Sequence, residues 1–132
     1  MPGAPPDFLV DRSLGLLAIP ALLRSAGYTV RTIDDVYGPG QVPDVEWIRD
    51  ADASGWVVAC KDDRIRRRPA ERRALAASTL RVFCLTAGNL QSTEQVERFR
   101  TNLPAIARVI GEPGPWVRGV YVDRIELLKL YS

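Results

Sequence analysis

The chain has 132 residues, of which 46% are hydrophobic and 26% charged, and its net charge is +2. This size and composition are typical of one soluble globular domain and exclude a wholly disordered or fibrous chain. The absence of histidine excludes Ser-His, Cys-His and His-metal chemistry, which leaves carboxylates as the main reactive groups at neutral pH. We expect residues 1–132 to form a single domain, with a flexible tail at residues 1–6.

The apolar pattern alternates between β-like and helical segments along most of the chain. It predicts strands at residues 8–10, 28–33, 56–60 and 81–85. It predicts helices at residues 14–26, 43–54 and 71–78, and an amphipathic segment that follows a capping-box pattern at residues 92–106. Pro20 is expected to kink the first helix and Pro104 to interrupt the last. Residues 117–122 and 124–130 predict a closing β-hairpin.

This order of elements predicts an α/β fold with a mostly parallel central sheet flanked by helices. The strands show little alternation of apolar and polar residues, which indicates a sheet covered on both faces. The hairpin is expected at the sheet edge. Cys60 and Cys84 lie in apolar strand-like runs without CxxC spacing, which favours two buried thiols over a disulfide or redox pair.

The sequence gives no sign of a membrane protein. No apolar run approaches the roughly 18 residues that a membrane span needs. Residues 1–6 have neither the basic nor the apolar region of a signal peptide. We therefore expect a cytoplasmic protein that makes no contact with a membrane.

Carboxylates follow three of the four predicted parallel strands, at the sheet edge where open α/β folds bind ligands. These acids are Asp11, Asp34, Asp35, Asp62 and Asp63, joined by Asp44 and Glu46 in the first turn of the helix after Pro43. Each one alone also suits a turn or a helix start. Several carboxylates that converge repel one another unless a cation neutralises them, and oxygen ligands suit Mg²⁺ or Mn²⁺.

A short basic segment lies at the same predicted edge. Seven basic and three acidic side chains give residues 61–73 a net charge of +4, so the rest of the chain carries −2. A charge run of this kind is often a solvated loop, but guanidinium groups also bind phosphate oxygens through bidentate contacts. Beside a metal site, the run would hold a nucleic-acid backbone while a metal-activated water attacks one phosphodiester.

Six segments occur in an informative order and spacing: 8–15 (FLVDRSLG), 27–30 (GYTV), 43–48 (PDVEWI), 55–62 (GWVVACKD), 69–73 (PAERR) and 85–90 (LTAGNL). In this order they resemble the PIN-like domains, which include the toxins of VapC-type toxin–antitoxin pairs. The resemblance spans roughly residues 7–110. Two positions depart from the family pattern: Cys60 stands where related domains often carry threonine, and no acid follows the fourth strand.

The resemblance implies a single PIN-like domain that acts as a metal-dependent endoribonuclease, the toxin of a type II toxin–antitoxin pair, with Mg²⁺ or Mn²⁺ as cofactor. It implies catalytic and metal-binding roles for Asp11, Asp44 and Asp62. Polar side chains expected beside these ligands are Ser13, Asp35, Glu46, Asp63, Thr86 and Asn89. Basic side chains expected to contact RNA are Arg12, Lys61, Arg64, Arg66, Arg67 and Arg68. Expected partners are RNA, a cognate antitoxin and, as a further candidate, a second copy of the chain.

The two adjacent acids after the third strand are expected to have different roles. If strand alternation persists, residues 58, 60 and 62 share one face of the sheet while 59, 61 and 63 share the other. The resemblance assigns the ligand position to Asp62 and leaves Asp63 in a turn or beside the ligands.

Other functions remain open at this point. The absence of an acid after the fourth strand fits a PIN-like module that binds RNA or a protein without catalysis. A phosphoacceptor receiver would need paired acids after the first strand, where Asp11 is followed by Arg12. A nucleotide-binding domain has even less support, because no GxGxxG or GxxxxGK[ST] motif follows a strand.

Overall fold

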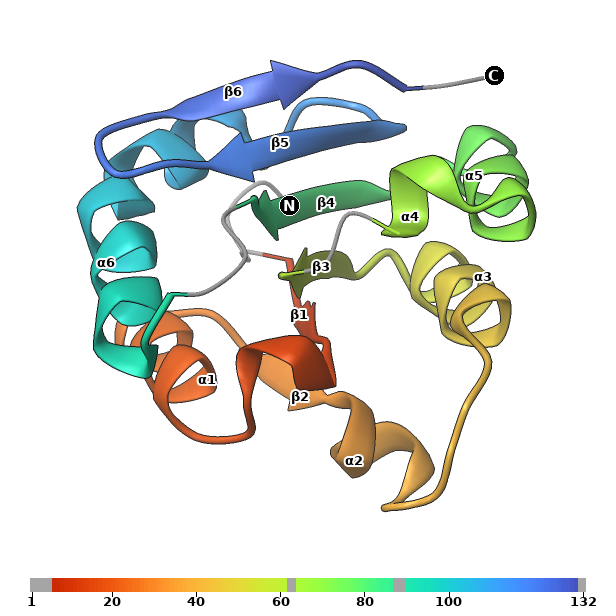
Figure 1. Cartoon of the computed structure of the whole chain (residues 1–132), viewed down its shortest axis with the longest axis horizontal. Helices are drawn as coiled ribbons and strands as arrows, with labels where there is room; N and C mark the ends of the chain where they lie inside the picture. Colours follow the sequence, from red (N-terminus) through yellow and green to blue (C-terminus); the bar gives the residue numbers. More distant parts are fainter. Residues whose placement is uncertain (1–5, 62–63, 87–89, 131–132) are drawn as a thin grey trace.

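A six-stranded sheet in the order β2-β1-β3-β4-β5-β6 forms the centre of the computed structural model, which describes residues 6–61, 64–86 and 90–130 (Figure 1). The strands are β1 (Phe8–Val10), β2 (Val30–Thr32), β3 (Val57–Cys60), β4 (Arg81–Leu85), β5 (Trp116–Val120) and β6 (Ile125–Leu128). Strands β1 to β5 pair in parallel, and β6 runs antiparallel to β5 at one edge. The expected mostly parallel sheet with a C-terminal hairpin at its edge is confirmed.

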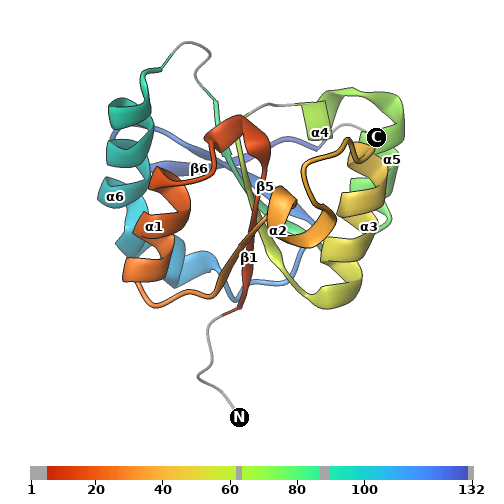
Figure 2. The ribbon, with the colours of Figure 1, turned by 90° about the horizontal axis from the view of Figure 1, so that it is seen from below.

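Helices cover both faces of this sheet. They are the 3₁₀ turn η1 (Arg12–Leu14), α1 (Ala18–Ser25), α2 (Ile33–Tyr37), α3 (Asp44–Ser54), α4 (Arg64–Arg67), α5 (Pro69–Ala76) and α6 (Ser92–Val109). Figure 2 shows α1 and α6 on one side of the strands, with α3, α4 and α5 on the other. The sheet is therefore the middle layer of a three-layer α/β/α arrangement.

The strands are apolar because both of their faces are buried. In β3, Val57 and Ala59 join the core under α1 and α6, whereas Val58 and Cys60 join the core under α3 and α5. A strand buried in this way has no position for a solvated polar side chain. The alternation expected from the sequence thus holds as far as Cys60, which places residues 58 and 60 on the α3 and α5 side.

Two segments differ from the helices expected at residues 14–26 and 92–106. Pro20 lies in the first turn of α1, where its missing N–H is not needed, so it does not kink the helix. Residues 12–14 form the separate turn η1. Pro104 lies inside α6, which nevertheless continues to Val109 because its buried face packs on the sheet. Its capping box uses Gln91 with Glu94, one residue before the expected start.

Helices α2 and α4 were not expected. Helix α2 is started by a capping box in which Thr32 Oγ1 accepts a hydrogen bond from Asp35 N (3.1 Å) and Asp35 Oδ2 accepts one from Thr32 N (2.9 Å). Helix α4 includes most of the arginine run, for which the sequence analysis predicted no helix. Cys60 and Cys84 are both buried and are not joined by a disulfide bond, as the sequence indicated. Within the described ranges, no helix is both long and apolar enough to cross a membrane.

Candidate active site

A small cavity lies where β1 and β3 end, between the first turns of α3 and α5. Its volume is about 10 Å³, close to the space that one water molecule needs. Its lining consists of Asp11, Asp44, Trp47, Ile48, Cys60, Ile65 and Glu71. The structure thus brings together two of the three acids expected as ligands, Asp11 and Asp44, although they are 33 positions apart in the chain.

The position of Asp11 follows from the strand that precedes it. Leu9 packs on the α3 and α5 side of the sheet, so Asp11, two residues later, is directed to the same side. Ser13 Oγ donates a hydrogen bond to Asp11 Oδ2 (2.6 Å) and accepts one from Lys61 N (3.0 Å). One hydroxyl therefore ties the carboxylate after β1 to the backbone that follows β3. Asp11 itself is only 8% exposed.

Asp44 enters the cavity from α3. It is the first residue of that helix, directly after Pro43, and it is half-buried. The indole of Trp47, one turn further on, donates from Nε1 to Asp44 Oδ1 (3.0 Å). Trp47 is buried, so this hydrogen bond gives the carboxylate a fixed orientation.

A larger, open pocket adjoins the small cavity. Its volume is about 390 Å³, within the range of sites that hold small ligands. It shares Asp11, Asp44 and Trp47 with the cavity and adds Arg12, Ser13, Ile33, Gln41 and Val42. The carboxylates of Asp11 and Asp44 therefore line both the solvent-accessible pocket and the small cavity behind it, which has room for about one water molecule.

Glu71 is a cavity residue that the sequence analysis did not select. It lies in the first turn of α5, where an acid suits the helix dipole. The sequence could have identified Glu71 by its spacing from the apolar Leu75, one helical turn later. Leu75 is 1% exposed, so this spacing places Glu71 on the buried face of the helix. Glu71 is 9% exposed.

The side chain of Arg12 makes its hydrogen bonds within the protein. Its Nε donates to Asp34 Oδ1 (2.6 Å), and its Nη2 donates to the carbonyl oxygens of Gly38 (2.8 Å) and Gly40 (2.6 Å). These contacts fix the loop that leads into α3 and so help to place Asp44. Asp34, one of the acids after β2, is therefore the partner of an arginine at the rim of the open pocket.

The arginine run divides into buried and exposed members. Arg66 is 8% exposed, and its Nη1 donates to the carbonyl oxygen of Lys129 (2.6 Å), which connects α4 to the segment after β6. Arg67 and Arg68 are exposed, and Lys61 is half-buried. Among the described basic side chains near this edge, Arg67 and Arg68 therefore have the surface exposure that contact with a nucleic-acid backbone requires, and Lys61 is exposed in part.

The remaining expected site residues either line neither the small cavity nor the open pocket or lie outside the described residues. Asp35 serves the capping box of α2, and the backbone hydrogen bond from Thr32 holds the pKa of its carboxyl below the usual value. Glu46 on α3 and Thr86 after β4 are exposed. Asp62, Asp63, Asn89 and the side chain of Arg64 lie outside the described residues. Within the described part of the chain, no three Asp, Glu, Cys or His side chains are grouped closely enough to hold a metal ion by themselves.

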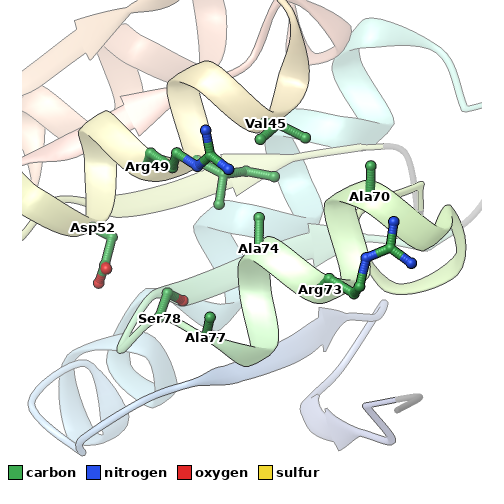
Figure 3. Close-up of a pocket in the computed structure, with 9 residues that line it drawn as sticks. Val45, Arg49, Asp52, Ala70, Arg73, Ala74, Ala77 and Ser78 are labelled. Atoms are coloured by element: carbon green, nitrogen blue, oxygen red, sulfur yellow. The ribbon is translucent and has the colours of Figure 1, made fainter.

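A separate groove is formed by residues of α3 and α5. This groove has a volume of about 440 Å³. Figure 3 shows Ala70 and Ala74 of α5, and Ala77 directly after that helix, on the side that faces α3, with Arg49 and Arg73 beside the groove. Asp52, the acid in its lining, accepts hydrogen bonds from the backbone N (2.9 Å) and hydroxyl (3.0 Å) of Thr79. The groove therefore lacks the convergent carboxylates of the cavity.

Comparison with known proteins agrees with this arrangement. A family profile described as a PIN-like domain matches residues 6–87. The chain is also 37% identical over 119 residues to a curated Mycobacterium tuberculosis protein named "Putative ribonuclease VapC45", a match that covers 88% of this chain and 86% of that protein. No solved structure matches the chain with statistical significance. With its parallel sheet and with acids from β1 and α3 at one cavity, the chain belongs to the PIN-like domain family.

Proposed function

We propose that the protein is a divalent-metal-dependent endoribonuclease and the toxin of a type II toxin–antitoxin pair. The observation that carries the proposal is the convergence of Asp11 and Asp44 on one cavity at the carboxyl edge of the sheet. The family supplies the context, and the relative named as a ribonuclease supplies the substrate class.

The residues at the cavity fit a hard divalent cation. Three of them offer carboxylate oxygens, beside the thiol of Cys60, and the chain contains no histidine to favour a softer metal. A carboxylate as buried as Asp11 is also costly without a positive partner. We propose Asp11, Asp44 and Asp62 as the residues that hold Mg²⁺ or Mn²⁺. A cation of this kind activates water and offsets charge on a phosphodiester.

The protein's own side chains position these acids and receive the substrate. Ser13 fixes Asp11, Trp47 fixes Asp44, and Arg12 secures the loop before α3. The open pocket in front of Asp11 and Asp44 provides space for a nucleotide. Lys61, Arg67 and Arg68 would contact the RNA backbone, whereas Arg66 would act mainly through its contact with the segment after β6.

Three further expectations belong to this proposal. The partner is an antitoxin, by analogy with the VapC-named relative. The protein works in the cytoplasm, where its RNA substrate is present. A homodimer is the expected arrangement of the chain itself, which light scattering of the purified protein tests.

The decisive experiment measures cleavage of a fluorescent single-stranded RNA by the purified protein with Mg²⁺, with Mn²⁺ and with EDTA. We expect cleavage with a divalent cation only, and at least about a 100-fold loss of rate in Asp11→Asn and Asp44→Asn. Asp123→Asn, in the exposed turn between β5 and β6, serves as the matched control and should leave the rate unchanged. RNA binding without cleavage under every condition would instead support the non-catalytic module.

A further inference from the structure

Three acidic side chains line the small cavity, and none of its described lining residues is basic. Asp11 comes from the end of β1, Asp44 from the start of α3 and Glu71 from the first turn of α5. Asp11 accepts hydrogen bonds from Ser13, and Asp44 accepts one from Trp47. Glu71 differs from both, because no hydrogen bond or ion pair joins its side chain to any other residue that the structure describes.

The side chain of Glu71 is largely buried, although its carboxylate oxygens keep some contact with solvent. Burial of a carboxylate away from water is costly, and the cost rises when other carboxylates face the same space. The rest of the lining, which consists of Trp47, Ile48, Cys60 and Ile65, contributes no counter-charge. A cation in or beside the cavity would offset the charge of Glu71 together with that of Asp11 and Asp44.

We propose that Glu71 belongs to the cation site as an outer carboxylate, one that accepts hydrogen bonds from the water shell of the ion. This inference rests on the proposed function and deepens it. Mg²⁺ usually keeps several waters and binds directly to only one or two carboxylates. An outer role also agrees with the spacing of the described acids, of which no three are grouped as direct ligands. Glu71 thereby supplies, from α5, the acid that is absent after β4.

The test compares Glu71→Gln with Glu97→Gln. Both replace a carboxylate by an amide of similar size, but Glu97 is exposed on α6, far from the cavity lining. Mn²⁺ affinity is measured by calorimetry for the wild type, both variants and Asp11→Asn. We expect Glu71→Gln to weaken Mn²⁺ binding by about 10–100-fold, as is usual when a group that orients metal ligands is removed. Glu97→Gln should bind Mn²⁺ as the wild type does.

A second measurement requires no variant. In ¹³C-labelled wild-type protein, Mn²⁺ should broaden the side-chain carboxyl resonance of Glu71 and leave that of Glu97 sharp. A resonance of Glu71 that stayed sharp with Mn²⁺ bound would refute the proposal even if Glu71→Gln failed to fold. A merely structural role would change the unfolding free energy without affecting Mn²⁺ affinity.

The outcomes separate this inference from the proposed function. If the wild type binds Mn²⁺ and Asp11→Asn does not, while Glu71→Gln binds as tightly as the wild type, the role of Glu71 is refuted and the metal site stands. If the wild type binds no Mn²⁺ at all, the proposed function fails and this inference fails with it.

Discussion

The hydroxyl of Ser13 provides a sharp test of how the end of β1 is held. Ser13→Ala removes the donor to Asp11 Oδ2 and the acceptor for Lys61 N. A hydrogen bond to a charged group contributes about 1.5–3 kcal/mol, and a buried N–H without an acceptor costs about 1–3 kcal/mol. Lys61 is half-buried, so water partly replaces that second bond. We therefore expect the free energy of unfolding to fall by about 2–3 kcal/mol.

Urea denaturation in EDTA measures this loss without a contribution from bound metal. The midpoint should fall while the slope with denaturant stays unchanged, because the native fold is retained. Ser25→Ala is the matched control, since its hydroxyl donates to the carbonyl oxygen of Leu22 (2.6 Å) at the exposed end of α1. It should cost no more than about 0.5 kcal/mol. Equal losses in the two variants would show that the link from Asp11 through Ser13 to Lys61 contributes no special stability.

Three further predictions address the metal, the RNA and the pH dependence. Mn²⁺ at 100 times its Kd should stabilise the wild type by about 2.7 kcal/mol, and Asp11→Asn should lose most of this gain in thermal unfolding. Replacing Arg67 and Arg68 together by glutamine should reduce the salt slope of single-stranded RNA binding by about 1.4 units in fluorescence anisotropy titrations, while an unchanged slope would indicate a solvated surface. Asp35→Asn should lower the unfolding free energy at pH 7 by about 0.5 kcal/mol, because it removes a charged acceptor at the start of α2. The pKa of Asp35 is lowered in the fold, so acid denaturation profiles of variant and wild type should converge as the pH falls below about 3.9 and through the folded value.

Local patterns accounted for most of the architecture. The apolar runs at residues 57–60 and 81–85 are buried on both faces, and such strands can be recognised without knowing their neighbours. Gly55, in the left-handed conformation, ends α3 where the sequence indicated a stop. Helix α2 was missed because five residues are too few for a periodic signal, and its capping box overlaps the end of β2.

The sequence by itself determined that acids follow the parallel strands, because strand ends and helix starts are local features that the chain order brings to one edge. It therefore placed Asp11 and Asp44 among several acids at that edge, and the resemblance to PIN-like domains selected these two as ligands. Only the tertiary structure decided which other charged side chains face them. Glu71 points into the cavity because α5 packs beside α3, and Arg66 is buried because α4 meets the segment after β6. The sequence shows the charge of such residues, but their partners are set by contacts between elements that are distant in the chain.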